Sequence, residues 1–233
     1  MMNITIDHLS AGAERARGVT VIIDVFRAYT VESYAFSRGI DRIYPIADLE
    51  AAYALKAQHP DWLLAGERKM VAGQGFDYGN SPAQLEHADL HGRSMIHTTS
   101  AGTQGIIAAK NADVILLGAL VNARATAAYI RSLQPEYVSL VCMGLENRRP
   151  TQEDTACAEY IKAILEGTDD RFDKAGTIDM LREGDGARFF VPENQAYAPE
   201  RDFHLCVEFD KFDFALRVQK EENGLDYTTP VRA

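Results

Sequence analysis

The sequence has 233 residues, of which 46% are hydrophobic and 25% are charged, an ordinary composition for a globular protein. Its 34 acidic and 24 basic side chains give a net charge of −10 without any long run of lysine and arginine, so neither nucleic acid nor a membrane surface is an expected partner. The three cysteines lack CxxC spacing, which favours a reducing, cytoplasmic location over a disulfide framework. No signal peptide and no membrane span are expected, because no apolar stretch reaches the length of a bilayer.

Strand and helix signals alternate along the first two thirds of the chain. The strongest is residues 19–26, Val-Thr-Val-Ile-Ile-Asp-Val-Phe, whose continuous β-branched run predicts a strand buried on both faces. Further strands are expected over 3–8 (an edge strand), 41–46, 62–65, 94–97, 113–117 and 137–142, and helices over 31–38, 49–58, 104–110, 122–133 and 151–166. This alternation predicts a three-layer α/β/α protein with a largely parallel or mixed sheet, built either as one body or as two lobes around one active-site cleft.

The alternation of strand and helix signals becomes less regular beyond Gly167. A helix is expected over 172–182 and a pair of strands over 205–209 and 212–218, followed by a polar end. No interdomain linker is recognisable, so one domain is predicted over residues 1–233, with a less regular part from about residue 168.

A long glycine-rich loop, residues 65–82, interrupts the alternation. It carries the acid–base–acid set Glu67, Arg68 and Asp77, together with apolar side chains that would anchor it. Long loops inside compact chains are usually functional or disordered, and the apolar anchors favour an ordered functional loop. The plainer interpretation is a connector with solvated charges.

Polar residues follow four of the predicted strands. Ligands of open α/β sheets bind beyond the carboxyl ends of the strands, so groups in these positions can converge although they are far apart in sequence. The residues concerned are Asp24 and Arg27 after the first such strand, Glu67 and Arg68 after the second, Thr98, Thr99, Ser100 and Thr103 after the third, and Glu146, Glu153 and Asp154 after the fourth.

The residue types suggest binding of a phosphorylated anion with a metal ion. The hydroxyl-rich turn of residues 98–103 would cradle an oxyanion, and Arg27 and Arg68 would clamp it. The hard oxygen ligands suited to Mg²⁺ are Asp24, Glu67 and Asp77. Glu153 and Asp154 are further candidate ligands, although acids in the first turn of a helix often only complement its dipole.

Several of these strings occur together in one known family. They are Asp24-Val-Phe-Arg27-Ala, Gly66-Glu67-Arg68, Gly75-Phe-Asp77-Tyr-Gly79-Asn80-Ser81-Pro82, the turn of residues 98–103, Asn122-Ala, Cys142-Met-Gly144 and Glu153-Asp154. In this order the chain resembles the 2-phosphosulfolactate phosphatase family, Mg²⁺-dependent enzymes of coenzyme M and sulfolactate metabolism. The resemblance extends over nearly the whole chain, and the string around Asp77 is its most specific part.

The resemblance implies a cytoplasmic α/β enzyme that removes phosphate from a small 2-phospho organic acid. A homodimer is a separate expectation for the chain. Asp24, Arg27, Glu67 and Asp77 are the predicted catalytic residues, and Mg²⁺ is the predicted cofactor. Substrate and phosphate would be held by Arg27, Arg68, Asn80, Ser81, Thr98, Thr99, Ser100, Gly102 and Thr103. Direct attack by water is favoured over an aspartyl phosphate on Asp24.

Two alternatives remain at this stage. Cys142 and Arg148 have the Cys-x5-Arg spacing of cysteine phosphatases, although Glu146 would lie in the loop between them and repel a thiolate. A non-catalytic protein that binds anions or metabolites could also use the same scaffold.

Overall fold

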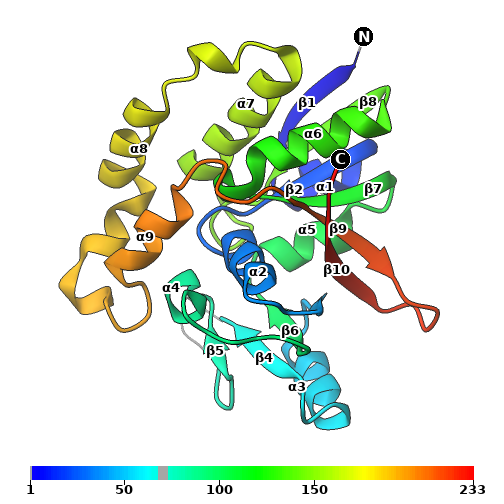
Figure 1. Ribbon diagram of the computed structural model, residues 1–233, viewed down its shortest axis with the longest axis vertical. Coiled ribbons are helices and arrows are strands. Elements are labelled where there is room, and N and C mark those ends of the chain that lie inside the picture. Colours follow the sequence, from blue (N-terminus) through cyan, green and yellow to red (C-terminus); the bar gives the residue numbers. More distant parts are fainter. Residues whose placement is uncertain (1, 68–72) are drawn as a thin grey trace.

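The protein, seen here in a computed structural model that describes residues 2–67 and 73–233, is built on one mixed sheet (Figure 1). Its strands are β1 (Asn3–His8), β2 (Gly18–Ile23), β3 (Arg42–Pro45), β4 (Leu63–Gly66), β5 (Tyr78–Gly79), β6 (Ser94–Thr98), β7 (Ala112–Gly118), β8 (Tyr137–Cys142), β9 (Ala215–Lys220) and β10 (Asp226–Val231). The α-helices are α1 (Leu9–Arg15), α2 (Ala28–Ser37), α3 (Leu49–Gln58), α4 (Pro82–Leu85), α5 (Gly102–Ala108), α6 (Ala123–Leu133), α7 (Gln152–Glu166), α8 (Lys174–Glu183) and α9 (Glu200–Cys206). Short 3-10 turns are η1 (Leu120–Asn122), η2 (Asp169–Arg171), η3 (Asp185–Phe190) and η4 (Pro192–Asn194).

The sheet consists of two parallel groups joined by an antiparallel hairpin. The strand order is β1-β8-β2-β7-β9-β10-β3-β6-β4-β5. Within β1-β8-β2-β7 and within β3-β6-β4-β5 all pairings are parallel, whereas β9 and β10 pair antiparallel with each other and with their outer neighbours. The predictions of a largely parallel or mixed sheet and of an edge strand at residues 3–8 are therefore confirmed.

The two parallel groups run in opposite directions, because three antiparallel pairings separate them. In Figure 1, β1, β2, β7 and β8 occupy one end of the molecule, β4, β5 and β6 occupy the other, and α2 lies between them. Residues that follow β2 and β8 nevertheless lie close to residues that follow β4 and β6. The site described below lies between these opposed strand ends, rather than along one edge of a single parallel sheet.

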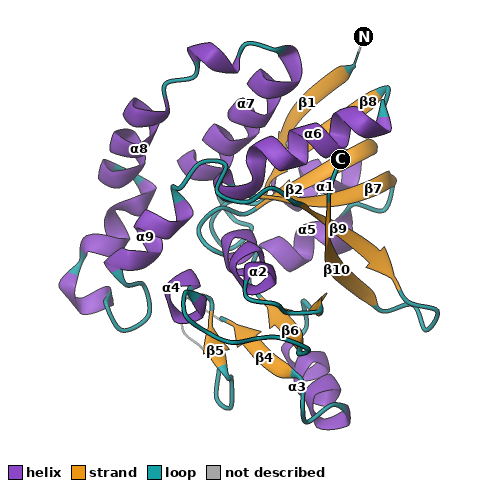
Figure 2. Ribbon diagram, in the orientation of Figure 1, coloured by secondary structure: helices purple, strands orange, loops and turns teal. Residues whose placement is uncertain are grey.

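Helices cover both faces of the sheet, as an α/β/α architecture requires (Figure 2). Neighbouring residues of one strand enter different cores: Ile22 packs with residues of α1, α2 and α5, whereas Val21 and Ile23 pack with residues of α6, α7 and α9. A smaller cluster joins Ala52 of α3 to Leu64 and Ile96. Burial on both faces explains why the strand signal is a continuous apolar run instead of an alternating one.

Local sequence signals account for several helix ends. Asp48 accepts a hydrogen bond from the backbone amide of Ala51 at 2.8 Å and so caps α3, as its position predicts. The helix α7 ends at Gly167, which adopts a left-handed conformation with a φ of 74°. No helix within residues 2–67 and 73–233 combines the length and the apolar character needed to cross a membrane.

The C-terminal third departs from the sequence-based prediction. The strand expected over 205–209 is wrong, because Glu200–Cys206 forms the helix α9. A short apolar run such as Leu205-Cys206-Val207 does not distinguish a buried helix from a strand by periodicity alone. The following strand begins at Ala215, later than expected, and its partner β10 lies in the segment that appears only polar in sequence.

Candidate functional site

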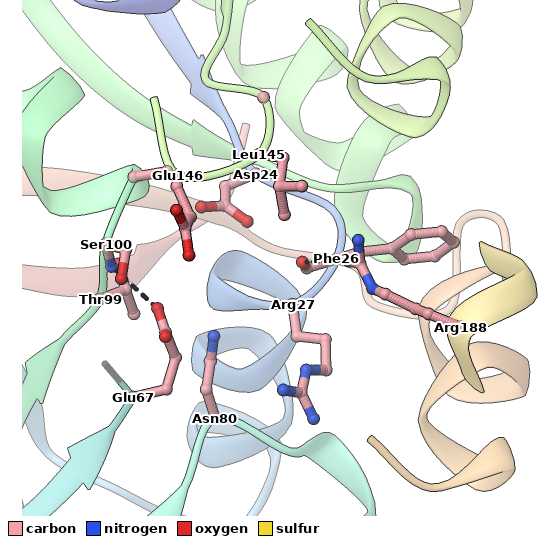
Figure 3. A pocket seen from close by; sticks show the side chains of 12 residues that line it. Asp24, Phe26, Arg27, Glu67, Asn80, Thr99, Ser100, Leu145, Glu146 and Arg188 are labelled. Atoms are coloured by element: carbon pink, nitrogen blue, oxygen red, sulfur yellow. Dashed lines mark hydrogen bonds between the residues drawn. The ribbon is translucent and has the colours of Figure 1, made fainter. Parts of the chain in front are cut away.

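A pocket lies between the opposed carboxyl ends of the two strand groups (Figure 3). It is formed by the segments that follow β2 and β8 together with the segments that follow β4 and β6. Its lining residues are Asp24, Phe26, Arg27, Glu67, Asn80, Thr99, Ser100, Ala101, Gly144, Leu145, Glu146 and Arg188. Residues from four strand ends therefore meet in one place, as their position in the sequence predicts.

Asp24 directly follows β2 and is only 8% exposed. Burial raises its pKa to about 6, and the nearby charge of Glu67 adds to the rise, whereas the backbone amide of Ala28 opposes it. That amide lies 3.3 Å from Oδ1. His97, which is fully buried with Nδ1 3.0 Å from Glu32 Oε1, also lowers the pKa of Asp24. Asp24 is thus a carboxylate held in a confined site beside a second carboxylate.

Glu67 follows β4, and its Oε1 accepts a hydrogen bond from the backbone amide of Ser100 at 2.9 Å. This contact links the segment after β4 to the segment after β6. The preceding Gly66 has a φ of +134°, and a Cβ there would lie 1.9 Å from the carbonyl oxygen of Thr98. Only glycine allows this close approach, so Gly66 fixes where the Glu67 side chain enters the pocket.

Arg27 is held by a buried ion pair. Its Nη1 donates to Asp202 Oδ2 of α9 at 2.7 Å and to the carbonyl oxygen of Tyr197 at 2.7 Å. Asp202 also accepts from Ser81 Oγ at 2.6 Å and from the amide of Ala83 at 3.0 Å. One buried carboxylate therefore positions Arg27 and the loop that follows β5.

The hydroxyl-rich turn contributes unequally to the pocket. Thr99 and Ser100 line it, whereas Thr98 completes β6 in the interior. Thr103 donates from Oγ1 to the carbonyl oxygen of Thr99 at 3.0 Å and so stabilises the start of α5. Gly102 lies against Asp24, because a Cβ there would be 3.1 Å from Asp24 Oδ2.

Two buried polar atoms beside the pocket have no protein partner within the described part of the chain. They are Oδ1 of Asn80 and Oγ1 of Thr99, and both residues line the pocket. Buried polar groups without hydrogen bonds are uncommon and call for an explanation. A polar ligand in the pocket would supply these hydrogen bonds.

The expectation that Asp77 lies in this pocket is wrong. Its Oδ2 accepts from the backbone amide of Leu64 at 2.8 Å and pairs with Lys56 at 3.1 Å, and Asp77 is absent from the pocket lining. Asp77 thus fastens the loop against β4 and α3. Arg68, expected beside Glu67, lies outside the described residues, and Ser81 faces Asp202 instead of the pocket.

Glu153 and Asp154 lie behind the pocket and do not line it. Asp154 accepts the amide of Val25 on Oδ1 at 2.9 Å and that of Gly144 on Oδ2 at 2.8 Å, which joins the segments after β2 and β8. Burial raises the pKa of Asp154, and the charge of Glu153 adds to the rise. The proposed metal role of this pair remains an expectation, and in this structure Asp154 supports the pocket wall.

Sequence reasoning missed Arg188 and Asp202, and it placed Glu146 among the groups that could converge without giving it a chemical role. Glu146 lines the pocket and has a φ of 51°. Its carboxylate forms an ion pair with Arg148, whose side chain is exposed. Arg188 comes from η3, in the irregular C-terminal part where no strand end marks a site. For Asp202 the only signal is an acid just after Pro199, in a segment that was assigned to no element.

The cysteine phosphatase alternative does not fit the geometry. Cys142 is fully buried at the end of β8, and burial raises the pKa of its thiol, with a further rise from Asp154. The Arg148 side chain is 80% exposed and pairs with Glu146. The site therefore has neither a stabilised thiolate at Cys142 nor an arginine side chain that faces Cys142.

The carboxylates of the pocket suit a cation that keeps its own waters. Asp24 and Glu67 face the same space and repel each other, and Glu146 lies on the same pocket wall. No group of three or more His, Cys, Asp or Glu side chains in the described ranges is arranged to hold a metal by itself. Mg²⁺ is usually bound through one or two carboxylates together with waters and substrate oxygens, so this donor set fits Mg²⁺.

Comparison with known proteins identifies the family. Residues 5–221 match the family model described as 2-phosphosulpholactate phosphatase. The chain belongs to this family. A probable 2-phosphosulfolactate phosphatase of Bacillus subtilis (strain 168) is 32% identical over 203 residues, which cover 87% of this chain and 88% of that protein. A protein of the same name from Caldanaerobacter subterraneus subsp. tengcongensis is 30% identical over 224 residues and 90% of each chain.

As a member of the 2-phosphosulpholactate phosphatase family, the protein is a phosphoric monoester hydrolase. A third relative, from Symbiobacterium thermophilum, is 37% identical over 158 residues, 67% of either chain.

Proposed function

We propose that the protein is a Mg²⁺-dependent phosphatase that converts 2-phospho-3-sulfolactate to 3-sulfolactate and inorganic phosphate. The observation that carries this proposal is the convergence of Asp24, Glu67 and Arg27 in one pocket of a chain that belongs to this family. Carboxylates on one side and guanidinium groups on the other suit a substrate bound through both a cation and direct charge contacts.

Asp24 and Glu67 are the residues that would hold Mg²⁺, with Glu146 on the same wall. When bound there, Mg²⁺ would neutralise the charge of the phosphate oxygens and act as a Lewis acid. The protein itself restrains these carboxylates: the Ser100 amide orients Glu67, and the Ala28 amide approaches Asp24. Such restraint before the substrate arrives reduces the cost of forming the site.

Arg27, Asn80 and Thr99 would bind the remaining oxygens of the substrate. Asp202 occupies Nη1 of Arg27, which leaves the other guanidinium nitrogens for the ligand. The unpartnered atoms of Asn80 and Thr99 offer further hydrogen bonds. A pocket carboxylate, Asp24 or Glu146, would orient the attacking water, and the proton would leave through that group.

The same proposal places the enzyme in sulfolactate metabolism, as a step of coenzyme M synthesis in the cytoplasm. The three cysteines are free and buried, which is compatible with a reducing compartment. The excess of acidic side chains disfavours nucleic acid as a partner. A homodimer remains an expectation.

Release of inorganic phosphate from 2-phospho-3-sulfolactate by the purified protein tests this function. We expect turnover with Mg²⁺, loss of turnover in excess chelator and recovery when Mg²⁺ is added back. Turnover that persists in excess chelator would contradict the metal-assisted mechanism. Tight binding of the substrate without any phosphate release would instead favour the non-catalytic binding protein.

A further inference from the structure

Arg188 enters the pocket from the C-terminal part of the chain. It belongs to η3, and its guanidinium carbon lies 5.7 Å from the centroid of the Phe26 ring and 5.1 Å from that of Phe189. Figure 3 shows its guanidinium beside Phe26, across the pocket from Glu67 and Ser100. The aromatic rings orient a cation that reaches into the site from outside the sheet.

Few hydrogen-bond donors of this guanidinium have a partner among the described residues. Its one hydrogen bond runs from Nη2 to the carbonyl oxygen of Phe26 at 3.1 Å, and none of the ion pairs formed within residues 2–67 and 73–233 involves it. Arg27, by contrast, has Asp202 at 2.7 Å. A guanidinium carries several N–H donors in a fixed fork, so most of those of Arg188 remain for a ligand.

The charges around Arg188 are of both signs. Burial lowers the pKa of Arg188 and the like charge of Arg27 adds to the lowering, whereas the charges of Glu153, Asp185 and Asp24 oppose it. Among the described residues, however, none of these carboxylates forms an ion pair or a hydrogen bond with Arg188, whose one side-chain hydrogen bond goes to the carbonyl oxygen of Phe26. The guanidinium groups of Arg188 and Arg27 both line the pocket and keep donors for an anion.

We propose that Arg188 is a specificity-determining residue that binds the sulfonate of the substrate. This inference rests on the proposed function and deepens it. The phosphate belongs near Asp24 and Glu67, where a cation would hold it, so the second strong acid of the substrate reaches toward the opposite side. A sulfonate is always ionised and more weakly hydrated than a carboxylate, which suits a guanidinium flanked by aromatic rings.

A pair of substrates isolates this contact. The ester 2-phospholactate keeps the phosphate and the carboxylate of 2-phospho-3-sulfolactate but has a methyl group where the latter has a sulfomethyl group, so it lacks only the sulfonate. We expect Arg188→Met to lower kcat/KM for the sulfonated ester by about 10- to 100-fold, the range for a lost hydrogen bond to a charged group, chiefly through KM. For 2-phospholactate the change should be small. Arg188→Lys should recover only part of the loss, because charge remains while the fork is gone.

Arg182→Met is the matched control. Arg182 is exposed on α8, stacks on Phe190 at 4.7 Å and does not line the pocket. It should leave both substrates unaffected. Equal losses of kcat/KM for both esters in Arg188→Met would show that Arg188 serves the phosphate or the fold, and unchanged values would show that it does not contact the substrate. Either result overturns the inference.

Binding of the product separates this inference from the proposed function. Calorimetry should show that the wild type binds 3-sulfolactate more tightly than lactate, and that Arg188→Met removes the difference. This measurement needs no turnover. A wild type that hydrolyses neither ester yet shows the Arg188-dependent preference would refute the phosphatase and retain the sulfonate site. An active phosphatase without that preference would refute the sulfonate site alone.

Discussion

The buried ion pair between Arg27 and Asp202 gives the sharpest prediction about stability. Their side chains are 5% and 0% exposed, and Asp202 also accepts hydrogen bonds from the Ser81 hydroxyl and the Ala83 amide. In Asp202→Ala the guanidinium of Arg27 would remain buried without its counterion. Breaking such a pair from one side typically costs about 3–5 kcal/mol. Ser81 and the amide of Ala83 would also lose their acceptor, and a buried donor without a partner costs about 1–3 kcal/mol. These costs are not strictly additive with that of the broken ion pair.

A loss of about 4 kcal/mol corresponds to a decrease in Tm of roughly 8–16 °C for a chain of this size. Thermal unfolding followed by circular dichroism measures the change. The matched control is Asp213→Ala, which removes an exposed partner of Arg232 and should leave Tm equal to that of the wild type. In a double-mutant cycle, Arg27→Met should relieve part of the Asp202→Ala loss, because no charge is then left buried. An Asp202→Ala protein that melts like Asp213→Ala would refute this reasoning.

Three further predictions concern single residues. Arg27→Lys should lower kcat/KM about 10-fold or more while the protein remains folded, because the ammonium cannot pair with Asp202 and also present a fork to the substrate; unchanged kinetics would make Arg27 peripheral. Cys142→Ser should retain near-native phosphate release, because the thiol is buried and protonated, and an inactive, folded variant would revive the thiolate mechanism. Gly66→Ala should reduce both Tm and activity, because its Cβ would meet the carbonyl oxygen of Thr98 at 1.9 Å; wild-type values would show that β4 shifts without cost.

The sequence predicted the architecture well where strands are buried on both faces. The predicted strands at residues 19–26 and 137–142 correspond to β2 (Gly18–Ile23), which ends just before Asp24, and to β8 (Tyr137–Cys142), and both lie inside the sheet. The opposed direction of the two strand groups could not be predicted, because it depends on β9 and β10. The strand β10 includes Asp226, Thr228, Thr229 and Pro230, which resemble a polar tail until they pair with β9.

The pocket was predictable wherever its residues directly follow strands. Asp24, Glu67, Thr99 and Ser100 meet because each leaves a strand end that faces the middle of the molecule. Asp77 misled the prediction, because its carboxylate serves the backbone of Leu64 in a loop that looks functional.

Arg188 reaches the pocket from η3, and Asp202 holds Arg27 from α9; the position of both depends on long-range packing that no local pattern records. The same packing provides the positive side of the pocket. The sequence therefore indicated most of the pocket residues, including Arg27, Asn80 and Thr99, but missed Arg188 and the carboxylate of Asp202 that positions Arg27.

The central claim is that Asp24 acts in the pocket and that Asp77 acts in the fold. The most direct test compares kcat/KM for phosphate release from 2-phospho-3-sulfolactate in Asp24→Asn and Asp77→Asn, both of which keep shape and remove one charge. Asp24→Asn should lose at least about 100-fold, on the order of several kcal/mol of transition-state stabilisation. Asp77→Asn should remain close to the wild type, because its amide oxygen can still accept from Leu64. A folded Asp24→Asn protein with near-native kcat/KM, or an Asp77→Asn protein that alone is inactive, would contradict the account.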